Sequence, residues 1–322
     1  MYRGFVANKV SVIMAIYNEP IEWIELAVDS ILKQTYADFE FIIVNDKPDR
    51  KQNLDLLSKY SALDTRITII DNGENFGLTK SLNKGLRLAN GYYIARMDAD
   101  DIAMPTRFEK QVEFLNKNEE YSACGTRAIS IDESGKKNKI LRKPIHNDEI
   151  RLNLIIGNPM IHPTMMIRSS IMRDNGLMYD ETLRFAQDYD MVRNLIVLGK
   201  LHNLSEKLLY YRKSKKQITS VNLEGQNFCA NQTRERLILQ QLKTMDISLK
   251  TKDSFFDENA TKLLNEIKGN KNIRANPFLR DVNIALLLNS EKKQAIKMIL
   301  EVLLTNKTSI KNKLRLIIHI FK

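Results

Sequence analysis

The feature that most constrains the fold is a regular alternation of two kinds of segment over the first 100 residues. Apolar, β-rich runs occur at 10–16, 39–45, 66–71 and 92–97. Between them, apolar residues recur every three or four positions, as on one face of a helix, in segments that begin at Pro20, surround Leu54 and Leu57, and run from Leu78 to Ala89 before Gly91. Strand–helix–strand alternation predicts an α/β fold in which helices cover both faces of a parallel sheet.

Polar side chains follow each of these predicted strands. The four strand ends read Tyr17-Asn18-Glu19, Asn45-Asp46, Asp71-Asn72 and Asp98-Ala99-Asp100. Because ligands of such sheets bind at the carboxyl ends of the strands, the pattern predicts a binding site along this one edge.

The second part of the chain is more varied. A helix is expected after Pro105, a hairpin at 122–142 with its turn at 133–136, an extended run at 163–168, a helix from about Asp188 to Gly199, and a strand at 206–212. From about residue 219 to the end the pattern is helical. We therefore expect a helical extension to follow the α/β region.

The stretch ARMDADD, residues 95–101, places three aspartates within four positions. Two carboxylates 4 Å apart repel by roughly 4 kcal/mol at an effective dielectric near 20. Residues two apart in a strand face the same way, so Asp98 and Asp100 can converge while Met97 and Ala99 point into the sheet. Paired carboxylates suit Mg²⁺ or Mn²⁺. The alternative is structural: Asp98 ends the strand, and Asp101, for which this role fits best, caps the helix near Pro105.

The net charge of +11 is unevenly distributed along the chain. Residues 216–322 carry 19 Lys and Arg against 10 Asp and Glu, so most of the excess lies there. The run 309–322 would form a helix with one apolar stripe flanked by lysine and arginine, which is typical of a helix in a membrane interface and equally of a terminal helix packed on its neighbours. No nucleic-acid motif accompanies the charge, which favours a membrane surface over nucleic acid.

Cysteine usage and hydropathy bound the cellular setting. Cys124 and Cys229 are far apart in the sequence and form no CxxC pair, which fits a reducing compartment. We find no signal-peptide pattern and no apolar run near the roughly 20 residues that span a bilayer. We expect a cytoplasmic protein that contacts the inner face of the membrane.

Four stretches together resemble glycosyltransferase family 2: VSVIMAIYNEP, SILKQTYADFEFIIVND, NFGLTKSLNKGL and ARMDADDIAMPTRFEKQ. The resemblance covers about residues 9–215 and is strongest to bacterial enzymes of O-antigen, capsule and exopolysaccharide synthesis. It implies a GT-A fold, a Rossmann-like nucleotide-sugar-binding domain with a mixed central sheet. The implied domains are 1–215, with 9–104 binding the donor and 105–215 the acceptor, and a basic helical extension at 216–322.

The resemblance also implies roles on the donor side. Asp100 matches the direct ligand of a Mn²⁺ or Mg²⁺ ion. Asp98 matches a residue that contacts the ribose or the water molecules around that ion. The family cradles the nucleobase and ribose with backbone at positions that correspond to Ala15, Tyr17 and Glu19, although core packing is an alternative for Tyr17. Asp46 matches the carboxylate that accepts a hydrogen bond from the uracil ring NH.

On the acceptor side, Asp188 matches the general base that an inverting transfer needs, with a helix N-cap as the alternative. The family's preceding Glu is Gln187 here, and we expect this loss of charge to make Asp188 a weaker base. His162 lies where the family often has a His-Pro pair lining the acceptor site, but a single histidine is more often structural. Asp190 is expected to be structural, as an acid in the first turn of a helix.

Other positions depart from the family pattern. Leu82 stands before Asn83 where many relatives have Arg, so the positive charge near the diphosphate is expected from Lys80 or Arg96. A second departure follows the pair Tyr211-Arg212. Ser214 occupies the place of a histidine there, which leaves any phosphate or metal contact to Arg212 or Lys213.

These observations predict an inverting enzyme that transfers a hexose from a UDP-sugar to a saccharide on polyprenyl diphosphate. One alternative is a sugar-nucleotide pyrophosphorylase, which would need a glycine-rich phosphate loop where this chain reads AIYNEP. Another is a basic protein that binds membrane surfaces without catalysis. The sequence does not identify the sugar.

Overall fold

The computed structural model describes residues 6–154, 157–214, 225–230, 232–233 and 236–237. The chain divides into two compact units, one of residues 1–150 and 157–233 and one of residues 151–156 and 234–322. Most of the predicted helical extension, including the run 309–322, lies outside the described residues. Among the residues that are described, no helix is long and apolar enough to cross a membrane.

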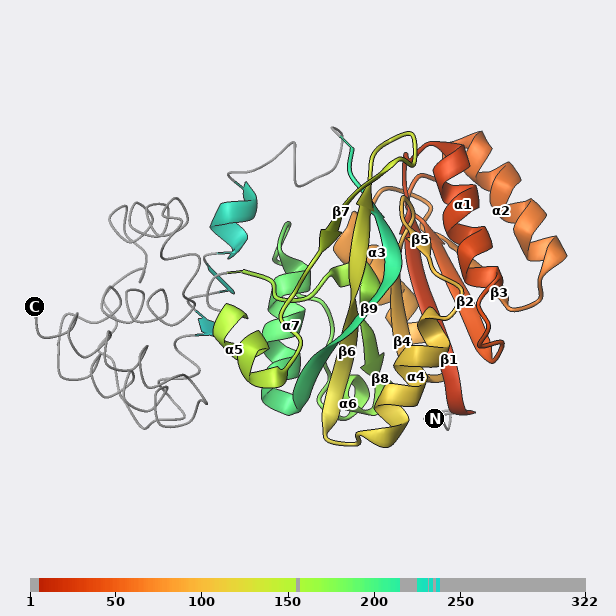
Figure 1. Cartoon of the computed structure of the whole chain (residues 1–322). Helices are drawn as coiled ribbons and strands as arrows, with labels where there is room; N and C mark the ends of the chain where they lie inside the picture. The colour runs from red at the N-terminus through yellow and green to blue at the C-terminus, as the bar shows by residue number, and fades with distance from the viewer. Residues whose placement is uncertain (1–5, 155–156, 215–224, 231, 234–235, 238–322) are drawn as a thin grey trace, which may run out of the picture. The chain divides into compact units, whose positions relative to one another are not determined.

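The first unit is built on one mixed sheet (Figure 1). Its strands are β1 (Val6–Ile16), β2 (Phe39–Asn45), β3 (Ile67–Asp71), β4 (Gly91–Asp98), β5 (Ile102–Ala103), β6 (Tyr121–Ile131), β7 (Lys137–Leu141), β8 (Met166–Arg168) and β9 (Lys200–Arg212). They lie in the order β3-β2-β1-β4-β8-β6-β9-β5, and β7 pairs with β6. The helices are α1 (Ile21–Leu32), α2 (Lys51–Leu63), α3 (Leu78–Leu88), α4 (Arg107–Lys117), α5 (Asn147–Leu154), α6 (Ser169–Asp174) and α7 (Gln187–Leu198), with a 3-10 turn, η1, at His162–Thr164.

The alternating N-terminal half forms the parallel part of the sheet, as predicted. β1 pairs in parallel with β2 on one side and β4 on the other, and β2 pairs in parallel with β3. All four strands therefore end at the same edge. One boundary differs from the prediction: α3 ends at Leu88, and Gly91 is the first residue of β4 rather than the end of the helix.

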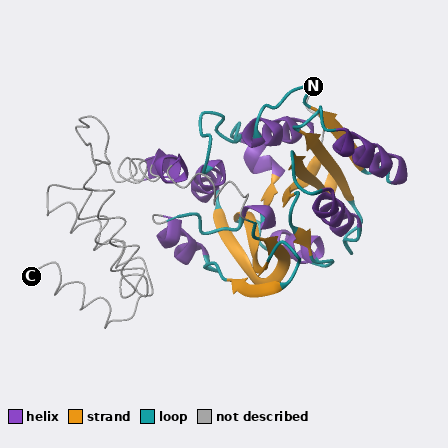
Figure 2. Ribbon diagram, turned by 90° about the horizontal axis from the view of Figure 1, so that it is seen from above, coloured by secondary structure: helices purple, strands orange, loops and turns teal. Residues whose placement is uncertain are grey.

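Helices lie on both faces of the sheet (Figure 2). One face of β1, with Val12 and Met14, belongs to a core cluster that also contains α1 and α4 side chains. The opposite face receives α3 so closely that a Cβ at Gly85 would stand 2.8 Å from the Ile13 side chain. Both faces of the strand are therefore buried, which explains its continuous apolar sequence.

The second half makes the sheet mixed. β8 runs antiparallel to β4 and β6, while β9 runs parallel to β6. The predicted hairpin is β6–β7 and the predicted helix near Asp188 is α7, whereas β9 begins at Lys200 instead of residue 206. The two-residue β5, α5 and α6 were not predicted, because each is too short to show a periodic pattern.

Candidate active site

Three carboxylates gather where β4 leads into β5. One carboxyl oxygen from each of Asp98, Asp100 and Asp101 lies within 4.8 Å of the other two. Met97 and Ala99 are buried, which confirms that alternate residues of this stretch face the sheet and the edge. Hard oxygen donors grouped in this way suit a divalent cation.

Asp101 does not have the helix-capping role that the sequence predicted. The N-cap residue of α4 is Thr106, and no side chain caps that helix. Asp101 is fully buried instead, and its Oδ1 accepts a hydrogen bond of 2.8 Å from the backbone N–H of Arg212. Burial, together with the charges of Asp100 and Asp98, raises the pKa of Asp101 well above its usual range.

The other oxygen of Asp101 provides a test of whether a cation fits the cluster. Within the described residues, Oδ2 of Asp101 is buried and has no hydrogen-bond partner. A buried carboxylate oxygen without a donor is costly unless a positive charge satisfies it. This orphaned atom beside Asp98 and Asp100 therefore fits a bound divalent ion.

Arg212, a candidate for phosphate contact, holds the backbone of this loop. Its Nε donates to the carbonyl oxygen of Asp100 at 2.8 Å, and its Nη1 donates to the carbonyls of Asp132 and Glu133 in the β6–β7 turn at 3.1 and 3.2 Å. The guanidinium also lies 4.7 Å from the ring centroid of Trp23. These contacts indicate that Arg212 holds the backbone of the Asp98–Asp101 stretch in place.

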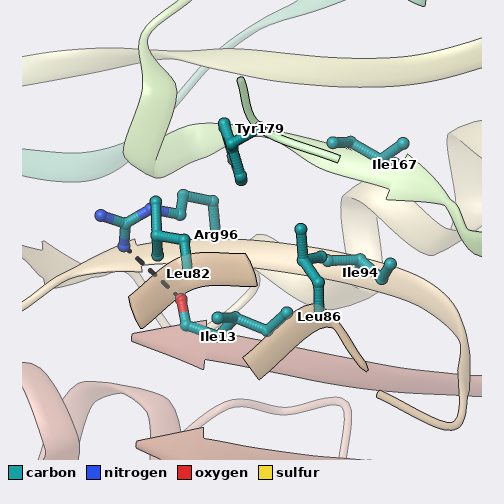
Figure 3. A pocket seen from close by; sticks show the side chains of 7 residues that line it. All are labelled: Ile13, Leu82, Leu86, Ile94, Arg96, Ile167 and Tyr179. Atoms are coloured by element: carbon teal, nitrogen blue, oxygen red, sulfur yellow. Dashed lines mark hydrogen bonds between the residues drawn. The ribbon is translucent and has the colours of Figure 1, made fainter. Parts of the chain in front are cut away.

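The two residues expected to supply positive charge near the diphosphate differ in setting. Arg96 is buried, forms an ion pair with Asp98 and reaches toward the carbonyl of Ile13. It borders a small cavity of about 10 Å³, space for about one water molecule, which is lined by apolar side chains and Tyr179 (Figure 3). Lys80 is exposed in the first turn of α3. Arg96 therefore offsets the charge of Asp98 from a buried position, whereas the Lys80 side chain is exposed to solvent.

The residues after β1 form a small hydrogen-bonded platform beside the carboxylates. The backbone N–H of Tyr17 donates to Glu19 at 2.7 Å, and the side chains of Asn53 and Arg50 donate to the carbonyls of Tyr17 and Glu19. Tyr17 is 41% exposed, so core packing does not account for it. Burial raises the pKa of Glu19, and the charge of Asp98 adds to the shift, which places Glu19 near the cluster.

Ala15 and Asp46 border the same edge. Ala15 is the partner of Asp98 in the β1–β4 register. Asp46 is buried, and its Oδ1 accepts hydrogen bonds of 2.8 Å from the Asn72 amide and the Phe76 backbone N–H. Its Oδ2 accepts from the backbone N–H of Gly77 at 2.9 Å. Asp46 thus orders the loop that leads into α3.

Asp188 lies in the first turn of α7. The N-cap position belongs to Ala186, so the alternative role of Asp188 as the cap is wrong. Its Oδ2 accepts a hydrogen bond of 2.8 Å from Nδ2 of Asn158. Burial raises the pKa of Asp188, and the charge of Asp98 contributes in the same direction. A carboxylate with a raised pKa is suited to accept a proton near neutral pH.

The rest of the α7 N-terminus is tightly constrained. Ala186 has a φ of 55°, a left-handed conformation that is unfavourable for alanine and persists only where the surrounding structure holds it. Gln187 is buried. Asp190 is buried as well and pairs with Arg193 at 2.9 Å, which confirms its structural role.

His162 is buried and is not exposed at the surface of the site. Its Nε2 lies 2.7 Å from the Tyr179 hydroxyl. Burial lowers the pKa of His162 well below its usual range, and the charge of Arg96 lowers it further. Asn83 exchanges two hydrogen bonds of 2.9 Å with the backbone of Tyr179. This arrangement favours the structural reading of His162.

Three residues that sequence reasoning missed or left without a role complete the site. Asn158 contacts Asp188, and Lys143 donates to the Asn158 carbonyl at 2.6 Å. Burial raises the pKa of Tyr211, and the charges of Asp101, Asp98, Asp100 and Asp188 all add to that shift. Tyr211 is therefore within electrostatic reach of both sets of carboxylates. Neither Lys143 nor Asn158 stands in a motif that would have revealed it.

Comparison with known proteins supplies an independent assignment. The family described as Glycosyl transferase family 2 matches residues 11–176. The chain is 38% identical over 205 residues to an uncharacterized glycosyltransferase of Methanocaldococcus jannaschii, covering 63% of this chain and 70% of that protein. It is 34% identical over 213 residues to the O-antigen biosynthesis glycosyltransferase WbnJ of Escherichia coli, covering 64% of this chain and 80% of WbnJ.

The fold has a solved counterpart as well. Staphylococcus aureus TarS 1–349, in complex with UDP-GlcNAc, aligns with a TM-score of 0.58 at 17% identity, covering 87% of this chain and 82% of TarS 1–349. At that identity the likeness concerns the fold alone. It agrees with the predicted GT-A fold.

Proposed function

The chain belongs to glycosyltransferase family 2, and on that premise we propose that it transfers a hexose from a UDP-sugar to a lipid-linked saccharide with inversion at the anomeric carbon. The observation that carries the proposal is the presence of two separate carboxylate groups within electrostatic reach of each other. Asp98, Asp100 and Asp101 form one group at the donor edge, and Asp188 stands apart at the start of α7. An inverting displacement needs this division, with one group near the leaving diphosphate and a base on the opposite side of the sugar.

The donor half would manage the leaving group. Asp100, supported by Asp98 and by the buried Oδ2 of Asp101, would hold a Mn²⁺ or Mg²⁺ ion. When bound, that ion supplies Lewis-acid stabilisation of the charge that develops on the diphosphate. The platform of Tyr17 and Glu19 would orient the nucleoside, with Asp46 keeping the adjoining loop in place and Lys80 facing the solvent side of the donor.

The acceptor half would manage the incoming hydroxyl group. Asp188 would accept the hydroxyl proton as that oxygen attacks C1 and the bond from C1 to the diphosphate breaks. Its raised pKa keeps it basic enough for this transfer, even though Gln187 replaces the acidic neighbour of the family. His162 would act indirectly, by holding the Tyr179 side chain in place through its hydroxyl.

A lipid-linked acceptor agrees with the relatives. The E. coli protein WbnJ is named for O-antigen biosynthesis, and an Erwinia amylovora relative is named for amylovoran biosynthesis. We propose that this chain extends a saccharide on polyprenyl diphosphate. The basic region 216–322 would bring it to the cytoplasmic face of the inner membrane.

A donor screen tests the proposal. Purified protein is incubated with UDP-Glc, UDP-Gal, UDP-GlcNAc or UDP-GalNAc, Mn²⁺ or EDTA, and a synthetic diphosphate-lipid acceptor. We expect transfer from one donor, loss of transfer in EDTA, and a β-linkage by NMR when the donor is α-linked. Transfer that proceeds equally in EDTA would overturn the metal role, and an α-linked product would overturn the inverting mechanism.

A further inference from the structure

Two segments that are distant from Asp188 in the sequence are fastened together beside it. Nδ2 of Asn203, on β9, donates to the carbonyls of both Pro144 and Pro159, at 2.6 and 3.1 Å. Gly125 on β6 leaves the space for Asn203, because any Cβ there would overlap its side-chain oxygen. The chain just after β7 and the chain just after Gly157 are therefore held side by side.

This fastening fixes the orientation of Asn158. Its Oδ1 accepts the backbone N–H of Met160 at 3.0 Å, so its Nδ2 must point the other way. That nitrogen donates to Oδ2 of Asp188 at 2.8 Å. These two hydrogen bonds together set the orientation of the Asn158 amide.

Lys143 completes the arrangement from the end of β7. Its Nζ donates to the carbonyl oxygen of Asn158 at 2.6 Å. Lys143 is half-buried, and burial lowers the pKa of its ammonium group while the charge of Asp188 opposes that shift. Half-buried lysines usually extend their ammonium group to solvent, but this one is turned toward a backbone carbonyl.

The surroundings of Asp188 explain why a cation is useful there. Asp98 acts on Asp188 from β4 and raises its pKa, and Lys143 acts in the opposite direction. The hydroxyls of Tyr179 and Tyr211 also lie within its electrostatic reach. Hydrogen bonds from Asn158 and from the backbone of Tyr189 favour the ionised carboxylate most, and the charge of Lys143 adds to them.

We propose that Lys143 and Asn158 are positioning residues for Asp188: Asn158 fixes the direction of its carboxylate, and Lys143 fixes Asn158 and keeps the carboxylate ionised. This inference rests on the proposed role of Asp188 as the general base.

The test compares the pH dependence of kcat in Lys143→Met, Lys143→Arg and Lys139→Met. Lys139→Met is the matched control, because it removes the same charge from an exposed position on β7. We expect the acid limb of the Lys143→Met profile to move to higher pH by about one unit, so that kcat on this limb falls by up to about tenfold. Lys143→Arg should restore most of the profile, and the KM for the UDP-sugar should stay unchanged.

Other outcomes overturn the proposal. A profile that is lowered uniformly with no shift, together with a lower melting temperature, would mean that Lys143 only stabilises the fold. An increase in the acceptor KM without a pH shift would mean that Lys143 contacts the acceptor directly. An Asn158→Ala variant, expected to lower kcat about tenfold at unchanged donor KM, separates the direction of the carboxylate from its charge.

An Asp188→Asn variant in the same series distinguishes two kinds of failure. If that variant keeps wild-type activity, Asp188 is not the base and the proposed function itself fails at this residue. If it is inactive but Lys143→Met has an unshifted profile, the role of Asp188 stands and the role of Lys143 alone is wrong.

Discussion

The two carboxylate groups of the site are built in opposite ways. The donor group comes from one short stretch, in which strand geometry and the turn after β4 bring three aspartates within four positions together. The acceptor group is a single carboxylate, Asp188, whose partner Asn158 comes from a different segment. Repulsion in the first group makes a cation useful, whereas the second group relies on a neutral amide and a neighbouring lysine. This difference predicts that the two halves respond to different perturbations.

The largest effect is expected from Asp100→Ala. Loss of this carboxylate should weaken the metal contribution by several kcal/mol and lower kcat about 10³-fold. Transfer measured across a Mn²⁺ titration should show the loss at every concentration. The matched control is Asp55→Ala, an exposed acid on α2, which should keep wild-type rates. Equal activity of Asp100→Ala and wild type would mean that transfer does not depend on a metal ion at Asp100. It would contradict the proposed difference between the two carboxylate groups.

Asp188→Asn should lower kcat by about 10²- to 10³-fold through loss of the base. Because the pKa of Asp188 is raised, the wild-type rate should fall on acidification at a higher pH than an ordinary aspartate would give. The variant's residual rate should lack this acid limb. Rates across pH 5–9 check both points, and an acid limb that persists in the variant would assign it to another group.

Arg212→Met tests whether the donor loop depends on its support. The substitution removes hydrogen bonds to the carbonyls of Asp100, Asp132 and Glu133 and the contact with Trp23. We expect a loss of about 2–4 kcal/mol in unfolding free energy, measured by urea denaturation. The control is the exposed neighbour, Lys213→Met, which should change stability by less than about 0.5 kcal/mol. Equal midpoints for the two variants would show that Arg212 is dispensable.

The smallest effect concerns His162. Its folded-state pKa is depressed by burial, so its contribution to stability is present above the unfolded value near 6.5 and is lost as pH falls below it. Below that value the wild type should lose up to about 1.4 kcal/mol per pH unit through this group. His162→Gln should show a shallower dependence between pH 7 and 5. Parallel curves for the two proteins would mean that the pKa of His162 is the same in the folded and unfolded states.

The donor half was largely predictable from sequence. Strand alternation identified Asp98 and Asp100, and the polar ends of the parallel strands identified the edge where Tyr17 and Asp46 lie. The predicted role of Asp101 as a helix cap was wrong. Its partner, the backbone N–H of Arg212, lies 111 positions away, and no local pattern indicates it. A local cap was the simpler reading of an Asp before a helix.

The acceptor half was predictable only in part. The start of α7 was visible as a helix with acids in its first turn, but the contacts of Asp188 were not. Lys143 and Asn158 lie in irregular chain between short elements, where periodicity carries no signal. Their association depends on Asn203 and on the space at Gly125, which are properties of the packed β6–β9 pair.

The most direct test measures UDP binding and transfer together in Asp100→Ala and Asp188→Asn. Calorimetric titration with UDP in Mn²⁺ should give wild-type affinity for Asp188→Asn and at least tenfold weaker binding for Asp100→Ala, while neither variant transfers sugar at more than about 1% of the wild-type rate. Such a result would place the leaving group with the β4–β5 carboxylates and the incoming hydroxyl with α7. Wild-type transfer by Asp188→Asn, or wild-type metal-dependent UDP binding by Asp100→Ala, would contradict this division.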